Sequence, residues 1–305
     1  MTEPVLDAWQ FFTQPSTPEE ESAAEVETGR TDFGVLPFAF PGIPSVRCLF
    51  STVATRNLSG TAETTADGVH CVARRKHALA RAFGLRQWAE LHQVHRDDFV
   101  LAPEHLADVN SWADSGPDSC TGESANPAPS GATAFPAVLT EPDQFAPYAN
   151  ADGQHTSQPG VGLVIKTADC QPILLAHKSG KAVAAIHVGW RGNVMNFPAT
   201  GVARFCAEYG FALHDVLAVR GPSLGPGAAE FINFDREWPQ EFAQWFDTDT
   251  RCMNLWELTR HQLQSAGIPA GNIFSLDLCT HSLPGLFFSY RRKHTGRQAS
   301  VIWIA

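Results

Sequence analysis

The sequence predicts an α+β fold, a mixed α/β sandwich in which a single domain holds a mixed β-sheet flanked by helices. Apolar runs of strand length cover residues 161–167, 172–177 and 182–187. Longer patterns typical of helices cover residues 69–84 and a stretch that runs from Gly192 to about Tyr209. Strands and helices do not alternate as they do in a parallel βαβ protein. With 305 residues, 44% of them hydrophobic, the chain is long enough to bury one large core.

Shorter patterns predict the other elements. We expect Pro198 to lie in the first turns of the second helix or to kink it, because proline lacks the amide hydrogen that a helix interior uses. A short element carries the sequence LHQVH at residues 91–95. Two more helices are predicted at residues 239–246 and 254–267, and further strands at residues 45–53, 216–221, 272–279, 286–292 and 299–305.

Two segments differ from the rest in composition. Residues 1–32 carry eight acidic residues against one basic residue, so most of the formal net charge of −10 comes from a stretch that we expect to be an acidic flexible tail. Residues from about 103 to 150 are rich in Ser, Pro, Gly and Ala, which predicts a low-complexity surface insertion. The expected domain is therefore 33–305, interrupted by this insertion.

Composition also limits the partners and the compartment. Outside the tail the chain is close to neutral and shows no basic stripe, which argues against nucleic-acid binding. No apolar run approaches the roughly 20 residues of a membrane-spanning helix, so no membrane partner is expected. The seven cysteines are odd in number and lack a paired spacing, which indicates a reducing cytoplasm. A soluble cytoplasmic protein is expected, and a monomer is favoured.

Two apolar strands end at side chains that are able to bind metals. Cys170 follows the first of them, and His187 stands at the end of another. With His95 they form a set of one thiolate and two imidazoles, and a catalytic zinc site holds three such ligands with a fourth position open. A cysteine after a strand is more often a small buried hydrophobe, and a histidine in an apolar run is more often a hydrogen-bonded core residue. Spacing alone favours this core interpretation.

Longer motifs around these residues favour the metal interpretation. The motifs are QVH at 93–95, TADCQPILL at 167–175, HVGWRG at 187–192 and FFSYRRKHTGRQASVIWI at 287–304. In this order they resemble the signature of the YfiH-like laccase-domain family, once called polyphenol oxidases and containing members that metabolise purine nucleosides. The resemblance covers roughly residues 45–305, apart from the insertion. It implies that His95, Cys170 and His187 bind one zinc ion, or a copper ion.

The motifs also depart from the family pattern in three places. The family's NQVHG reads here His92-Gln93-Val94-His95-Arg96, so we considered His92 as a further ligand or a neighbour. The cysteine-rich motif GPCIGPCCYEV becomes GPSLGPGAAEF at residues 221–231, where Ser223 replaces the first cysteine and Glu230 is kept. The TRxGGVS motif is reduced to residues 55–59, in which Arg56 matches the arginine.

The resemblance implies phosphorolysis of adenosine, inosine, guanosine or methylthioadenosine at the ribosyl C1, with deamination of adenosine at the same site. The expected partners are a purine nucleoside and phosphate. Phosphate requires fixed positive charge, and we expect Arg191, at a helix start, to supply it. Asp169 is expected to orient a metal-bound water or His187. The candidate catalytic residues are therefore Asp169 and Arg191, and the candidate substrate-binding residues are Arg56, Gln93 and Arg291, with Arg292 as a further choice.

Four of these residues also have a purely structural interpretation. Arg291 and Arg292 would be a solvated strand end, Asp169 a turn residue, and Arg191 a residue that pins a strand-to-helix turn.

Three other functions stay open. Oxidation of phenols at a multicopper site commonly uses His-x-His pairs, and the chain has 12 histidines with no such pair. The Pro-Cys-x-x-Cys motif of cytidine deaminases is also absent. Some family members are linked to correcting the peptide composition of cell-wall precursors, and nothing in the residues excludes this. Loss of several family glycines and cysteines is also compatible with a non-catalytic paralogue that binds a metal or a nucleoside.

Overall fold

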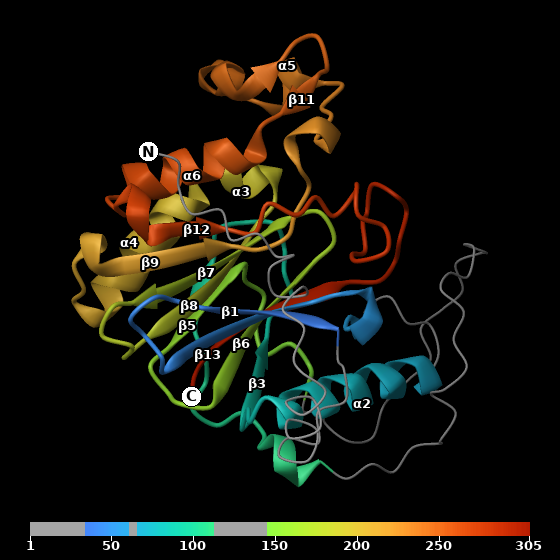
Figure 1. The fold of residues 1–305 in the computed structure, drawn as a ribbon, viewed down its shortest axis with the longest axis vertical. Helices are drawn as coiled ribbons and strands as arrows, with labels where there is room; N and C mark the ends of the chain where they lie inside the picture. Colours follow the sequence, from blue (N-terminus) through green and yellow to red (C-terminus); the bar gives the residue numbers. More distant parts are fainter. Residues whose placement is uncertain (1–33, 61–65, 113–144) are drawn as a thin grey trace, which may run out of the picture.

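The protein is a four-layer sandwich in which two β-sheets lie face to face and helices cover their outer faces (Figure 1). The computed structural model describes residues 34–60, 66–112 and 145–305. The predicted acidic tail and most of the predicted insertion lie outside these residues. The expected mixed α/β sandwich is confirmed, with the strands divided between two mixed sheets.

The first sheet has five strands. Its order is β1 (Val35–Ala39), β2 (Val46–Ser51), β13 (Gln298–Ile304), β6 (Val161–Thr167) and β3 (Gln87–Glu90). All neighbours are antiparallel except β3 and β6, which run parallel. The C-terminal strand β13 therefore lies at the centre of the sheet, where both of its edges are paired.

The second sheet has six strands. Its order is β12 (Ile273–Ser275), β9 (Val216–Arg220), β7 (Gln171–His177), β8 (Val183–Val188), β5 (Gly153–Thr156) and β4 (Phe99–Leu101). The two edge pairs, β12 with β9 and β4 with β5, are parallel, and the inner pairs are antiparallel. The chain passes from the first sheet to the second in the turn between β6 and β7, which contains Cys170.

Alternation of side chains along the strands divides the apolar residues between three layers of core. Leu163 and Ile165 of β6 point inward with Leu174 of β7 and form the core between the sheets. Val164 points outward and packs against α2 (Ala66–Ala82). On the outer face of the second sheet, α4 (Phe197–Tyr209) and α6 (Leu255–Ser265) cover residues such as Ile186.

A small lobe, residues 226–253, extends beyond the sandwich at the end that carries α3 (Trp190–Val194) (Figure 1). It contains α5 (Phe234–Glu237), a 3-10 helix at Gln240–Trp245, and the hairpin of β10 (Phe246–Asp247) and β11 (Cys252–Met253). Its aromatic core packs against Trp190 of α3. Short 3-10 turns elsewhere cover Val53–Thr55, Val109–Ser111, Leu213–Asp215, Pro226–Ala228 and Ala270–Asn272.

Three predicted elements differ from the structure. Residues 286–292, predicted as a strand, form turns, because the Phe287 amide donates to the carbonyl of Leu283 rather than to a neighbouring strand. The helix predicted at 239–246 is a 3-10 helix of six residues. The helix predicted from Gly192 is broken at Asn196, which has a positive φ of 56°, and restarts with Pro198 in its first turn.

One of the cysteines that the structure describes differs from expectation. Cys71 of α2 is disulfide-bonded, which the scattered spacing did not predict. Cys48, Cys170, Cys206, Cys252 and Cys279 are free.

None of the described helices combines the length and the apolar character that crossing a membrane requires.

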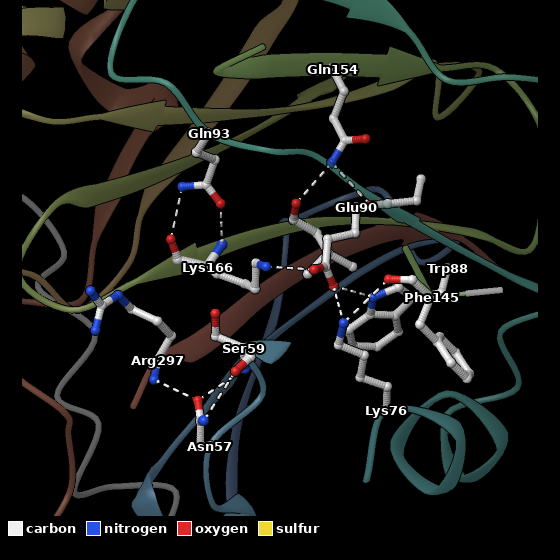
Figure 2. A network of polar contacts seen from close by, with 12 residues as sticks. Asn57, Ser59, Lys76, Trp88, Glu90, Gln93, Phe145, Gln154, Lys166 and Arg297 are labelled. Atoms are coloured by element: carbon white, nitrogen blue, oxygen red, sulfur yellow. Dashed lines mark hydrogen bonds and ion pairs between the residues drawn. The ribbon is translucent and has the colours of Figure 1, made fainter. Parts of the chain in front are cut away.

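A buried ionic cluster joins α2 to the first sheet (Figure 2). Glu90 of β3 accepts from Lys166 at 2.5 Å and from Lys76 at 2.7 Å, and its side chain is 1% exposed. The indole of Trp88 donates to the same carboxylate at 2.9 Å. Burial raises the pKa of Glu90, but the two lysines lower it by more, so the net shift is downward. The cluster therefore holds two ammonium groups against one carboxylate.

Glu90→Gln should destabilise the fold, because it leaves two buried ammonium groups without a counter-charge. Removing one partner of a buried ion pair costs about 3–5 kcal/mol, which would lower the urea midpoint. Glu241→Gln, at an exposed glutamate of the small lobe, is the matched control and should change little. Because the pKa of Glu90 is lowered on folding, its contribution is complete above the unfolded-state pKa of about 4.3 and disappears as the pH falls through the folded-state value. A stability difference that stays constant down to pH 3 would contradict this account.

Candidate metal centre

A cavity of about 1810 Å³ opens at one end of the sandwich, where β3, β6 and β8 end and β7 begins. The small lobe and the loop before β13 form its other walls. This volume exceeds the roughly 300–1,000 Å³ of most ligand pockets. Loops at strand ends are where folds commonly carry their functional groups, and all three predicted metal ligands line this cavity.

His95, Cys170 and His187 meet in the cavity. One ligand atom from each of the three residues lies within 4.8 Å of the other two. The sulfur of Cys170 is 3.9 Å from Nε2 of His95, close to the spacing of about 3.6 Å between a nitrogen and a sulfur ligand on a tetrahedral zinc. The two imidazole rings are perpendicular, with centroids 4.8 Å apart. His187 is buried and His95 is exposed, so the set is closed on the protein side and open to the cavity.

Asp152, at the start of β5, holds two of these residues in place. Its carboxylate accepts a hydrogen bond of 2.7 Å from Nδ1 of His187, which leaves Nε2 of that ring for a metal. It also accepts from the backbone amides of Val94, His95 and Arg96, at 3.2, 3.0 and 2.7 Å. Burial raises the pKa of Asp152, but the bonds to His187 and to the backbone outweigh it and lower the pKa. Asp152 is therefore an ionised carboxylate that positions both histidines.

Electrostatics in the set favour a thiolate. Burial raises the pKa of Cys170, but His187 and His95 outweigh this and bring it well below its usual range. Burial lowers the pKa of His187, but the Cys170 sulfur and Asp152 together raise it. These shifts favour a thiolate on Cys170 and a protonated ring on His187, and a bound cation would take the place of that proton. The donors present therefore fit a divalent metal ion.

Asp169 is not the carboxylate that bonds His187, which was one of its two expected roles; the other, orienting a metal-bound water, stays a prediction. The bond to Nδ1 of His187 belongs to Asp152, whereas Asp169 accepts from the Thr280 hydroxyl at 2.7 Å and the Ser289 hydroxyl at 3.0 Å. The backbone amide of Arg291 donates to it at 2.7 Å. Asp169 also has a φ of 92°, and His95 a φ of 60°, both in the left-handed region that non-glycine residues rarely occupy. These contacts hold the loop at 280–291 against the turn that carries Cys170.

Gly189 leaves room beside the set. A Cβ at this position would meet Cδ2 of His95 at 3.2 Å and Sγ of Cys170 at 3.3 Å, which is tighter than ordinary contact. The backbone between His187 and α3 therefore passes close to the ligand atoms, and a side chain here would crowd the metal position.

Arg191 lines the cavity from α3, which has only five residues. Its guanidinium is exposed and stacks on the ring of Trp190, 4.3 Å from the centroid. A buried amide network fixes this short helix: Asn193 donates to Thr259 at 2.8 Å and to Gln262 at 2.9 Å, both on α6. Gln171, next to Cys170, donates to the same Thr259 hydroxyl at 2.8 Å. Arg191 is thus carried on a rigid support tied to the Cys170 turn.

The predicted substrate-binding residues lie in different places. Gln93 lines the cavity, but both ends of its amide bond the backbone of Lys166, at 2.8 and 2.9 Å (Figure 2). Arg291 lines the cavity and donates to the carbonyl of Glu230 at 2.5 Å. Arg56 is exposed, with a φ of 65°, and does not line the cavity. Arg292 does not line it either, and donates instead to the Thr280, His281 and Phe287 carbonyls.

Two further positions, His92 and Ser223, differ from the family pattern in sequence. His92 lines the cavity but does not belong to the group of three close ligands, and it pairs with Asn150 in an isolated parallel bridge. Ser223 lies away from the cavity, where its hydroxyl accepts from buried Arg220 at 3.0 Å and from the Trp256 indole at 2.9 Å. Ser223 therefore serves the packing of β9 against α6 rather than the metal set.

Comparison with known families accounts for this arrangement. Residues 51–305 match the family described as "Multi-copper polyphenol oxidoreductase laccase". The chain belongs to this laccase family. The match begins at the last residue of β2 and covers every later strand of both sheets and all three residues of the metal set.

Curated relatives are about a third identical to this chain over the aligned half of it. The purine nucleoside phosphorylase YfiH of Escherichia coli K12 is 36% identical over 169 residues, which cover 52% of this chain and 66% of the relative. Human purine nucleoside phosphorylase LACC1 is 35% identical over 163 residues, 50% of this chain and 36% of the relative. The chain thus spans just under two thirds or less of the length of these relatives.

Solved structures show the same fold. YlmD from Geobacillus stearothermophilus superposes with a TM-score of 0.68 at 22% identity, covering 90% of this chain and 97% of that one. The protein YfiH of Bacillus licheniformis gives a TM-score of 0.65 at 22% identity, covering 85% and 93%. The laccase-family fold therefore extends through almost the whole of each neighbour.

Cys170→Ala and His187→Ala should each yield a folded protein that purifies with little metal, because two remaining ligands hold a divalent ion poorly. Cys252→Ala is the matched control, since Cys252 also lines the cavity but stands outside the ligand group, and it should keep its metal. His92→Ala should keep most of its metal too. Elemental analysis of the purified proteins checks all four variants. Undiminished metal in Cys170→Ala would remove Cys170 from the site.

Asp152→Asn should weaken metal binding by about 10- to 100-fold, the usual effect of losing a carboxylate behind a ligating histidine. Asparagine keeps the size but presents an N–H group to donors that need an acceptor. Zinc affinity, measured by competition with a chelator, reports the loss. Asp215→Asn, at a surface aspartate paired with Lys178, is the control. Equal zinc affinities for the two variants would show that Asp152 supports only the loop.

Proposed function

We propose that this chain is a metal-dependent purine nucleoside phosphorylase. The observation that carries the proposal is the His95–Cys170–His187 set, open on one side to a large cavity with cationic walls. Curated relatives at 34–36% identity are named purine nucleoside phosphorylases, which supports the same activity here. Deamination of adenosine and phosphorolysis of methylthioadenosine are further expected reactions of the same site.

The cavity offers each part of such a substrate a suitable surface. Ile232 and Tyr290 line it as unusually exposed apolar side chains, 62% and 65% accessible, and a planar purine stacks well on such groups. Arg191 offers phosphate two parallel hydrogen bonds.

The chain's own residues prepare the metal position. A zinc ion held by the three ligands would act as a Lewis acid, or would lower the pKa of a bound water for deamination. Asp152 keeps His187 in the tautomer that ligates through Nε2. In phosphorolysis an oxygen of phosphate forms a bond to C1 of the ribose while the bond from C1 to the purine nitrogen breaks and the base takes up a proton.

Oxidation of phenols is less well supported than phosphorolysis. Among the residues that the structure describes, one group of three or more close His, Cys, Asp or Glu ligands is found. A multicopper centre needs several such groups. Copper binds most such ligand sets more tightly than zinc, so weak oxidase activity of copper-treated protein would not by itself identify the reaction.

The decisive experiment incubates zinc-loaded protein with adenosine or inosine, with and without phosphate. Release of free base together with ribose 1-phosphate, only when phosphate is present, is the expected result. Ammonia from adenosine without phosphate would report the deamination. A protein that keeps its zinc but releases neither base nor ammonia would instead be a binding protein.

Arg191→Lys should lower phosphorolysis by about 10- to 100-fold and raise the phosphate requirement, because lysine keeps the charge and loses the planar fork. Deamination of adenosine uses no phosphate and should fall much less. Arg81→Lys, at an exposed arginine of α2 outside the cavity, is the matched control. Equal losses in both reactions with unchanged thermal stability would place Arg191 at the nucleoside or the metal. Lost stability together with both activities would mean that Arg191 only pins the turn into α3.

A further inference from the structure

One wall of the cavity belongs to the first sheet and was not part of the expected site. Arg297, just before β13, and Lys166, near the end of β6, both line the cavity there. Figure 2 shows Gln93 beside the backbone of Lys166, the Lys166 side chain directed to Glu90, and Arg297 bonded through its backbone amide to Asn57. Arg191 comes from the second sheet's side, on the helix after β8. The cavity therefore receives cationic side chains from both sheets, with the metal set where the chain crosses between them.

Arg297 is anchored so that part of its guanidinium stays available. Its Nη1 donates to the carbonyls of His294, Thr295 and Gly296, at 3.4, 2.8 and 2.9 Å. Its backbone amide donates to Asn57 at 3.0 Å, which ties it to the loop after β2. Within the described part of the chain, Nε and Nη2 have no hydrogen-bond partner, and neither is sealed in the interior. This Nε–Nη2 edge is one that grips an oxyanion with two parallel bonds.

The surroundings of Arg297 place it near the metal set. Burial lowers its pKa, while the charges of Cys170, Asp169 and Tyr290 act in the opposite direction. Its guanidinium carbon lies 6.0 Å from the centroid of the Tyr290 ring. Asp169 accepts hydrogen bonds from Thr280, Ser289 and the Arg291 amide, and among the described residues none joins it to Arg297. Arg297 thus faces the cavity with positive charge close to the metal position.

Lys166 adds a second uncompensated charge behind this wall. Its ammonium and that of Lys76 share the single carboxylate of Glu90, so the buried cluster carries a net charge of about +1. Burial lowers the pKa of Lys166, Glu90 raises it, and both Lys76 and Arg297 lower it again. Two positive charges that repel one another across a cavity wall are stabilised when an anion binds between or beside them.

The whole cavity shows the same imbalance. Its described lining holds six lysines and arginines and three acids, Asp169, Glu230 and Glu237. Outside residues 1–32 the chain is close to neutral. The excess of basic side chains in the cavity therefore attracts anionic ligands to it.

We propose that Arg297, supported by Lys166, forms an oxyanion subsite that binds a phosphate group at the first-sheet wall of the cavity. The group is carried either by inorganic phosphate, the co-substrate, or by a nucleoside monophosphate taken as substrate in place of a nucleoside. The choice of phosphate as ligand rests on the proposed function; the cationic wall itself does not.

Titration calorimetry on zinc-loaded, full-length protein tests the subsite with three probes: inorganic phosphate, adenosine 5′-monophosphate and adenosine. Arg297→Gln should raise the dissociation constant of at least one phosphate-bearing probe by about 10- to 100-fold, the effect of losing a charge-assisted two-pronged contact. Lys166→Met leaves the Lys76–Glu90 pair neutral and should weaken the same probe by roughly 3- to 10-fold. Arg81→Gln is the matched control and should change nothing. Melting temperatures confirm folding, and Lys166→Met decides the question if Arg297→Gln does not fold.

The pattern of loss identifies the source of the phosphate group. Weakened inorganic phosphate assigns the subsite to the co-substrate, whereas weakened monophosphate with unchanged phosphate and adenosine assigns it to a nucleotide substrate. Phosphate and monophosphate that bind equally well to wild type and Arg297→Gln, or that do not bind wild type at all, would overturn the proposal. Binding is measured without turnover, so the two proposals are tested separately. If the protein binds phosphate through Arg297 but releases no base, the subsite is supported and the proposed activity fails. If base is released but Arg297→Gln binds both phosphate-bearing probes normally, the subsite fails and the proposed activity is supported.

Discussion

The candidate metal centre depends on one buried carboxylate. Asp152 is fully inaccessible to solvent and receives four hydrogen bonds, from Nδ1 of His187 and from three consecutive backbone amides at 94–96. A buried carboxylate without such donors would be costly. Here the donors come from both ligand-bearing segments, so satisfying the charge also fixes His95 relative to His187. The left-handed backbone of His95 is tolerated because the three amide bonds determine the conformation of this loop.

A second carboxylate organises the other side of the centre in the same manner. Asp169 gathers two hydroxyls and one backbone amide from the loop that precedes β13, and so holds that loop over the turn of Cys170. The two apolar sheets supply a rigid base, and the irregular segments above them are fixed by charge-assisted bonds rather than by core packing. This division explains how a loop and a turn, which carry little apolar surface of their own, bring His95 and Cys170 to His187 of β8 with the three ligand atoms within 4.8 Å.

The sequence predicts the inner strands well and the supporting contacts poorly. The apolar runs at 161–167, 172–177 and 182–187 lie within one residue of the observed strands, because strands buried on both faces read as continuous apolar runs. The run at 286–292 has the same strand-like composition, yet its amides bond a local turn and Asp169, so composition alone was misleading.

The supporting carboxylate shows where sequence reasoning stops. Asp152 was missed because its partners lie 35 and 56–58 residues away, and no local pattern marks such a contact. The position of Asp169 beside Cys170 predicts that it orients a metal-bound water or His187, but adjacency in sequence does not determine where a side chain points, and its carboxylate accepts from Thr280 and Ser289.

Lys166 is the charged residue of the otherwise largely apolar strand β6. In β6 the outward positions alternate with the inward ones, so Lys166 occupies the same face as Val164, against α2. An apolar residue at this position would bury surface at no electrostatic cost, whereas the lysine requires Glu90 and still leaves one positive charge in excess. A departure from the local pattern that stability alone would not favour is expected at a functional site. Lys166 lines the same cavity as Arg297, which gives the excess charge a use that the core does not.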